Sequence, residues 1–144
     1  MTRTPWRSFE GSCHCGAIAF TFETAQAPEF WQIRACQCGF CRRHGARTTA
    51  DPAGRVVFRV RDQTALQRYG FGLHTADFLL CRNCGAYLAA VLTSANGQFA
   101  TLNVNALTEP PGLASAVAVS YDGESAQDRQ RRREQRWTPV IGTV

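Results

Sequence analysis

The sequence predicts a mainly β domain of antiparallel strands joined by cysteine-bearing turns, with one helix near the C-terminus. Short segments rich in β-branched and aromatic residues recur between turn residues, which is typical of strands. Seven cysteines occur in tight clusters, and only one long segment is rich in helix-forming residues. The 144 residues, 44% of them hydrophobic, fit a single domain, 1–144, with one packed core.

The strands are expected where apolar residues alternate with polar ones or form short buried runs. They are residues 17–23, 30–35, 55–61, 77–80, 87–92, 98–104 and 116–121. Because Asn96-Gly97 is a two-residue turn signal, residues 87–104 are expected to form a hairpin. One helical turn is expected over residues 39–44, ended by Gly45. Residues 124–136 are predicted as a helix within a basic helical tail, 122–144.

Two cysteine pairs far apart in the sequence together supply four thiolates. Cys13 and Cys15 are separated by one residue, and Cys81 and Cys84 by two. Four thiolates complete the tetrahedral coordination of a structural Zn²⁺ ion, so we expect these pairs to hold one zinc between them. A glycine follows the second cysteine of each pair, where it lets backbone amides turn toward sulfur. The alternative is that these four residues are buried free thiols.

A third cluster, Cys36, Cys38 and Cys41, places three thiols within six residues. Three protein ligands with an open fourth position are typical of a catalytic zinc. Two alternatives remain at this level. His44 can close the cluster as a fourth ligand and make it a second structural site. The cluster can also be metal-free in the isolated protein, because an open three-thiolate site is easily oxidised.

The composition limits which binding partners and which cellular location are expected for the protein. No apolar run is long enough to cross a bilayer, and the first residues have no apolar signal core, so we expect a cytoplasmic protein without a membrane partner. All 16 basic residues are arginine, and the formal charge is +5. Seven metal-bound thiolates and two Zn²⁺ ions lower this to about +2, which weakens the case for a nucleic-acid partner.

The three cysteine motifs resemble one known family. They read Gly11-Ser-Cys-His-Cys-Gly16, then Cys36-x-Cys-x-x-Cys-Arg-Arg43 followed by Gly45-Ala46, then Cys81-x-x-Cys-Gly85. Their order and spacing are similar to those of the GFA/CENP-V family, which is named for the glutathione-dependent formaldehyde-activating enzyme, S-(hydroxymethyl)glutathione synthase. The likeness covers residues 11–85 and extends through the strand pattern to about residue 120. The basic C-terminal segment is not part of the pattern.

The resemblance carries expectations of its own. It implies an Mss4-like fold of antiparallel β-sheets with zinc knuckles. It implies that the two cysteine pairs hold a structural zinc and that Cys36, Cys38 and Cys41 hold a catalytic zinc. In the family chemistry, the sulfur of glutathione interacts with that second zinc and then adds to formaldehyde.

The residues after the third cluster are candidate substrate contacts. Arg42 and Arg43 can attract the carboxylates of glutathione or another acidic thiol, and His44 can transfer a proton to a developing alkoxide. The alternatives are that the arginines pair with local acids and that His44 caps the turn. Trp31, Phe40 and Phe71 are candidate pocket residues, although aromatic side chains in a small domain more often belong to the core.

The first functional hypothesis is a zinc-dependent carbon–sulfur lyase that acts on the adduct of a small thiol, such as glutathione, and a small aldehyde. The second is a non-catalytic zinc protein that binds protein or nucleic acid through its basic C-terminal helix, residues 124–136, in which the run 129–133 resembles a nucleic-acid patch. The acidic neighbours Asp128 and Glu134 favour a solvated helix face there instead. A third hypothesis is a thiol sensor whose three-cysteine cluster releases zinc on oxidation.

Overall fold

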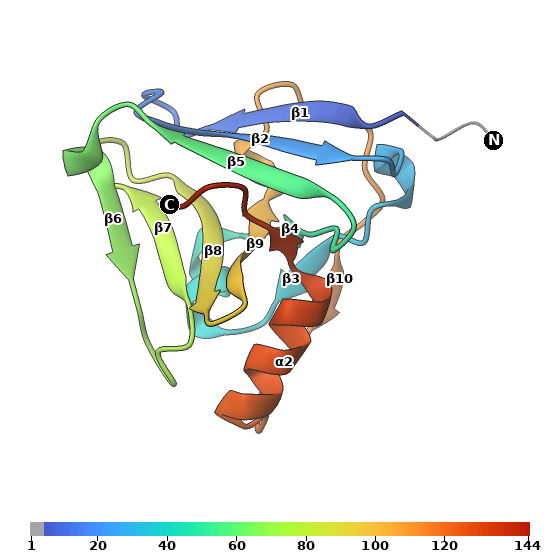
Figure 1. The fold of residues 1–144 in the computed structure, drawn as a ribbon, viewed down its shortest axis with the longest axis vertical. Helices are drawn as coiled ribbons and strands as arrows, with labels where there is room; N and C mark the ends of the chain where they lie inside the picture. Colours follow the sequence, from blue (N-terminus) through green and yellow to red (C-terminus); the bar gives the residue numbers. More distant parts are fainter. Residues whose placement is uncertain (1–4) are drawn as a thin grey trace.

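The computed structural model describes residues 5–144, and it confirms the mainly β fold class, with two sheets and one long helix. The smaller sheet is antiparallel, in the order β1-β2-β5, and runs along the top of the view in Figure 1. Its strands are β1 (Arg7–Ser12), β2 (Ile18–Thr24) and β5 (Arg55–Val60).

The larger sheet has the order β10-β3-β4-β9-β8-β7-β6, with β11 paired to β9. Its pairs are antiparallel except for the edge pair of β10 and β3, which is parallel. Its strands are β3 (Arg34–Cys36), β4 (Thr48–Thr49), β6 (Leu66–Tyr69), β7 (Asp77–Cys81), β8 (Tyr87–Ser94), β9 (Gly97–Asn103), β10 (Val117–Val119) and β11 (Thr138–Pro139). Single 3-10 turns occur at Pro28–Phe30, Gln63–Ala65 and Val104–Ala106.

The main core lies between the two sheets. On β2, Ile18, Phe20 and Phe22 are buried and alternate with half-buried residues, as expected for a strand with one covered face. Strand β8 is buried along residues 87–92 because both of its faces are covered. One face contributes Val91 to the main core, and the other contributes Tyr87 to a second apolar cluster beside the three-cysteine segment.

Helix α1 (Gly39–His44) carries part of the three-cysteine segment. It begins after Cys38, whose Sγ accepts a hydrogen bond from the backbone N–H of Cys41 at 3.4 Å. It ends at Gly45, which has φ of 57° and so adopts the left-handed conformation that glycine tolerates best. The predicted helical turn and its glycine stop are confirmed.

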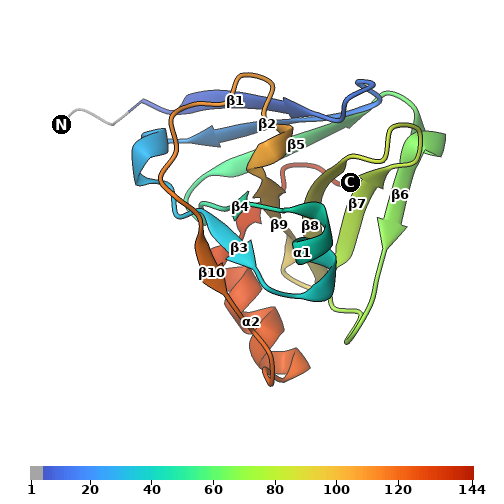
Figure 2. The ribbon, with the colours of Figure 1, turned by 180° about the vertical axis from the view of Figure 1, so that it is seen from behind.

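Helix α2 (Ala126–Arg136) is anchored at both ends. The hydroxyl of Ser125 caps its first turn by accepting a hydrogen bond from the N–H of Asp128 at 3.1 Å. After the helix, Trp137 is buried and β11 adds to β9, so the chain returns into the larger sheet. The segment predicted as a basic helical tail is therefore integrated into the domain, as Figures 1 and 2 show from opposite sides.

The predicted hairpin is confirmed by the antiparallel pairing of β8 and β9 around Gly97. The strand expected at 30–35 is shorter and starts at Arg34, because Pro28 begins a 3-10 turn just before it. Strands β1, β4, β6 and β11 were not predicted, since they are short or lack a clear alternation. Within residues 5–144, no helix combines the length and the apolar character that crossing a bilayer requires.

Candidate metal centres and the adjoining cavity

The two distant cysteine pairs meet in space. The Sγ atoms of Cys13, Cys15, Cys81 and Cys84 all lie within 4.8 Å of one another. Two of the sulfur–sulfur distances are 3.7 Å, from Cys13 to Cys15, and 3.5 Å, from Cys15 to Cys81. A tetrahedral zinc with Zn–S bonds of about 2.3 Å needs sulfurs about 3.8 Å apart. This four-cysteine cluster can therefore hold a metal ion, and its spacing is compatible with zinc.

Both pairs sit on the same kind of turn. Gly16 and Gly85, the residues after each pair, have φ of 81° and 80°. These left-handed residues turn the chain so that backbone amides face sulfur, and the N–H of Ile18 donates to Cys13 Sγ at 3.4 Å. Burial opposes ionisation of Cys84, but hydrogen bonds from backbone amides and from the Cys81 and Cys13 thiols together outweigh it and lower the pKa of this thiol to about 6. The turns thus favour the thiolate that a metal requires.

The second cluster has three cysteines and no fourth ligand of its own. The Sγ atoms of Cys36, Cys38 and Cys41 lie within 4.8 Å of one another, and no histidine or carboxylate of residues 5–144 belongs to this group. The ring of His44 instead packs on Phe40, with 4.4 Å between ring centroids. Closure of the cluster by His44 is therefore not the arrangement found. This three-cysteine cluster can hold a metal ion and leave one coordination position to another group.

The three thiols compete for protons. A hydrogen bond from Cys41 lowers the pKa of Cys36 to about 5, while the same contact and burial raise the pKa of Cys41 far above its usual range. One thiolate therefore forms readily, and further negative charge is disfavoured beside it. A divalent cation removes this repulsion, which is the electrostatic reason why such a cluster binds metal.

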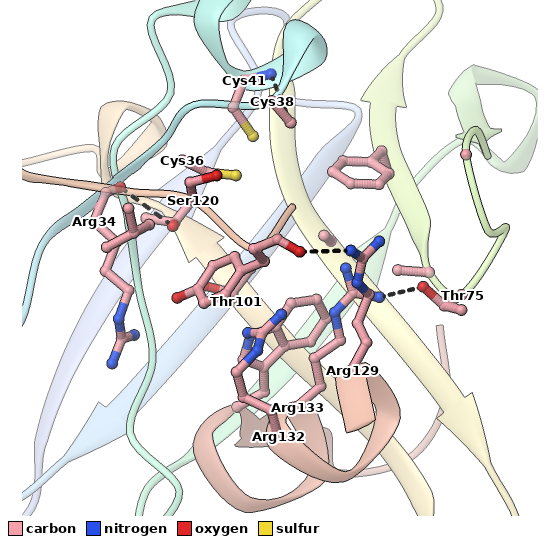
Figure 3. Close-up of a pocket in the computed structure, with 18 of the residues that line it drawn as sticks. Arg34, Cys36, Cys38, Cys41, Thr75, Thr101, Ser120, Arg129, Arg132 and Arg133 are labelled. Atoms are coloured by element: carbon pink, nitrogen blue, oxygen red, sulfur yellow. Dashed lines mark hydrogen bonds between the residues drawn. The ribbon is translucent and has the colours of Figure 1, made fainter. Parts of the chain in front are cut away.

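A cavity of about 420 Å³ opens beside the three-cysteine cluster. Its volume lies in the range of small-molecule sites. Cys36, Cys38 and Cys41 all line it, whereas no member of the four-cysteine cluster does. Figure 3 shows the cysteines on one side and the arginines of α2 on the opposite side. The two clusters thus differ in placement. All three thiols of the three-cysteine cluster line this cavity, whereas the four-cysteine cluster contributes only Cys13, to a separate pocket.

Five arginines and one aspartate line the cavity. Four of the arginines come from α2 and the fifth from β3; they are Arg129, Arg132, Arg133, Arg136 and Arg34. Glu124, just before α2, pairs with Arg129 at 3.2 Å and with Arg132 at 2.9 Å. Arg132 also stacks on Tyr121, with its guanidinium carbon 3.5 Å from the ring centroid. The wall contributed by α2 is therefore fixed by local contacts and is strongly cationic.

The candidate contacts Arg42, Arg43 and His44 are not among the residues that line the cavity. Arg42 and Arg43 are exposed on α1, and Arg43 donates to the carbonyl of Gly39 at 3.0 Å. His44 packs on Phe40, as described above. Helix α1 thus places Cys41 toward the cavity, while the neighbouring charged side chains occupy the outer face of the same turn.

The three candidate aromatic residues fall into different environments. Trp31 is buried in the main core, against Phe9 and Phe22. Phe71 lines the cavity, and the ring of Phe40 stacks on Phe71, with 5.7 Å between ring centroids, against the second apolar cluster. Tyr87 also lines the cavity and is almost fully buried. Burial, together with the charge of the nearby Cys41, raises the pKa of its phenol well above the usual range.

The sequence by itself does not identify the arginines of α2 or Tyr87 as residues that line a cavity. Because Asp128 and Glu134 flank residues 129–133, the sequence favours a solvated helix face there. Their spacing did carry a usable signal: Arg129, Arg132, Arg133 and Arg136 follow the i, i+3, i+4, i+7 pattern of one helix face. That pattern is normally sought for apolar residues, so it does not reveal an arginine face that lines a cavity.

The family to which the chain is similar matches the sequence up to helix α2 and no further. The family model described as glutathione-dependent formaldehyde-activating enzyme matches residues 8–122. A solved structure of a Rhodobacter sphaeroides protein, a structural genomics target, is 32% identical and covers 76% of this chain and 99% of its own, with a TM-score of 0.57. No curated protein matches the chain. Helix α2, which walls the cavity, lies beyond the residues that the family model matches.

Proposed function

Because the chain belongs to the glutathione-dependent formaldehyde-activating family, we propose that it catalyses the reversible addition of a small thiol, such as glutathione, to a small aldehyde such as formaldehyde. In this reaction the sulfur forms a bond to the carbonyl carbon, and the carbonyl oxygen gains a proton. The reverse reaction breaks that carbon–sulfur bond, so the activity is of the carbon–sulfur lyase type.

The observation that carries this proposal is the unequal placement of the two cysteine clusters. The three-cysteine cluster, incomplete as a tetrahedron, forms part of the wall of the cavity, and the complete four-cysteine cluster does not. We therefore assign a structural zinc to Cys13, Cys15, Cys81 and Cys84, and a catalytic zinc to Cys36, Cys38 and Cys41. A zinc ion at the second cluster lowers the pKa of a bound thiol, which makes the sulfur nucleophilic at neutral pH.

The remaining task of the cavity is to orient the aldehyde and supply a proton. Tyr87 is suited to this role, because a phenol is protonated at neutral pH and the side chain of Tyr87 lines the cavity. Its O–H can donate to the oxygen on which negative charge develops as the sulfur attacks carbon. Apolar side chains such as Phe78 and Ala90 line the same wall and limit access of water.

The role of Tyr87 predicts a kinetic effect without a structural one. Tyr87→Phe removes the hydroxyl and keeps the ring, so the rate of adduct formation is expected to fall roughly 10- to 100-fold, as for loss of one positioned proton donor. The control is Tyr69→Phe, the same change on β6 at a residue that does not line the cavity. An equal rate loss in both variants, or loss of zinc from Tyr87→Phe, would contradict the role.

The reaction itself is tested with the zinc-loaded protein. Exchange NMR measures the rate at which glutathione and formaldehyde interconvert with their adduct, with and without enzyme. We expect acceleration that scales with the amount of protein containing two zinc ions. If that protein leaves the exchange at the uncatalysed rate, the formaldehyde reaction is wrong, and a non-catalytic zinc protein becomes the better interpretation.

A further inference from the structure

Arg133 is a buried cation without an acidic partner. Its side chain is only 9% exposed, and no carboxylate of residues 5–144 forms an ion pair with it. One guanidinium nitrogen, Nη1, donates to Thr75 Oγ1 at 2.8 Å, and the guanidinium lies 4.7 Å from the ring centroid of Trp137. Its Nε is buried and has no hydrogen-bond partner. Among the described residues, Arg133 Nε is the one buried side-chain nitrogen or oxygen in this condition.

A buried guanidinium without a counter-ion and with an unsatisfied N–H lowers the stability of the folded protein unless another group pairs with it. Buried arginines are almost always paired, since an unpaired charge or an unsatisfied donor loses its hydration without compensation. Burial indeed lowers the pKa of Arg133 to about 10, with further lowering by the charges of Arg132 and Arg129. Because this pKa still lies well above 7, Arg133 remains a cation at neutral pH and contributes a positive charge to the cavity wall.

The acidic residue next to α2 cannot serve as the partner of Arg133, because two other arginines already bind it. Arg129 and Arg132 share Glu124, the acidic residue next to α2, at 3.2 and 2.9 Å. Arg34 and Arg136, which line the same cavity, have no ion-pair partner among the described residues either. Five arginines line the cavity, and the only acids beside them among the described residues are Glu124, paired with Arg129 and Arg132, and Asp122. The cavity wall therefore keeps a net positive charge beside the three-cysteine cluster.

We propose that Arg133 is the centre of an anion subsite in the α2 wall of the cavity, which binds a carboxylate of the thiol substrate while its sulfur reaches the three-cysteine cluster. This inference rests on the proposed function for the presence of a thiol, but the subsite itself rests on the geometry around Arg133. It assigns a specificity role to α2, the element beyond the family match, and it selects thiols that carry a carboxylate over neutral thiols of similar size.

The subsite can be observed in the unmodified protein. S-methylglutathione is a suitable probe because it keeps both carboxylates of glutathione but has no thiol to bind metal. In the zinc-loaded protein, ¹H–¹⁵N NMR follows the Nε–H of Arg133 during titration with this probe. The Nε–H resonance of Arg133 is expected to shift as a carboxylate binds to the guanidinium group. The diethyl ester of the probe, which lacks the negative charges, is expected to leave the resonance unchanged.

Two variants separate this subsite from general charge effects. Arg133→Met keeps an unbranched stem against Trp137 and removes the charge, so we expect about 10- to 100-fold weaker binding of S-methylglutathione by calorimetry, as for loss of a charge-assisted hydrogen bond. The matched control is Arg131→Met on the same helix. Arg131 is exposed and does not line the cavity, so affinity is expected to change less than about twofold.

The outcomes distinguish this proposal from the proposed reaction. A probe-dependent Nε shift with weaker binding only in Arg133→Met supports the subsite, even if the protein fails to accelerate adduct exchange. An unchanged Nε resonance at saturating probe overturns the subsite, even if exchange is accelerated. Equal affinity losses in Arg133→Met and Arg131→Met also overturn it. If Arg133→Met does not fold, the NMR titration of the unmodified protein still decides the question.

Discussion

Protein carrying Cys81→Ser is expected not to fold stably, whereas the parent protein unfolds cooperatively. Cys81 is 1% exposed, and its Sγ lies 3.5 Å from that of Cys15, which belongs to the other end of the cross-link. Structural zinc contributes about 10–16 kcal/mol of apparent binding free energy in small domains, and a typical domain has about 5–15 kcal/mol of stability. Loss of one thiolate ligand therefore weakens a contribution that is comparable to the whole free energy of unfolding.

The measurement is circular dichroism with thermal unfolding, together with metal analysis of the purified protein. We expect loss of the cooperative transition and fewer than one bound zinc per chain in the variant. A cooperative transition within a few degrees of the parent would show that the four-cysteine cluster does not hold the fold together. Cys38→Ser is the matched control, because it makes the same chemical change in the other cluster.

Cys38→Ser is expected to leave the fold intact and abolish the reaction. Serine is a good N-cap residue, so its hydroxyl can replace Cys38 Sγ in accepting the N–H of Cys41 at the start of α1. It is, however, a poor replacement for a soft thiolate ligand. The expected zinc content falls from two ions to one per chain, and the exchange rate falls by roughly 100-fold or more, since even outer partners of a metal site are worth about 10- to 100-fold.

The comparison of the two serine variants tests the division of the cysteines into four and three. Zinc content, thermal unfolding and exchange NMR are measured on both proteins under the same conditions. Loss of folding in Cys38→Ser would indicate that the second cluster is structural. Full exchange activity in a folded Cys38→Ser protein with one zinc would remove the three-cysteine cluster from the proposed chemistry.

The local motifs were predictable because their geometry is encoded within a few neighbouring residues. The spacing of Cys36, Cys38 and Cys41 fits a short turn and one turn of helix, and Gly45 marks where that helix ends. The glycines after each cysteine pair likewise impose the turns on which the thiols sit. Most strands could be found for the same reason, since alternation of buried and exposed residues is a property of each strand by itself.

Only the tertiary structure decides which charged side chains face the three-cysteine cluster across the cavity. Arg42 and Arg43 follow the three-cysteine cluster directly, yet the turn of α1 carries them away from the cavity. Arg133, more than ninety residues from Cys41, lines the cavity because β11 pairs with β9 and draws α2 against the larger sheet. Such contacts depend on pairing between distant strands, so no local pattern contains them. The sequence by itself therefore determined the thiols that can hold metal, and only the folded chain determined the charged wall that a ligand meets beside them.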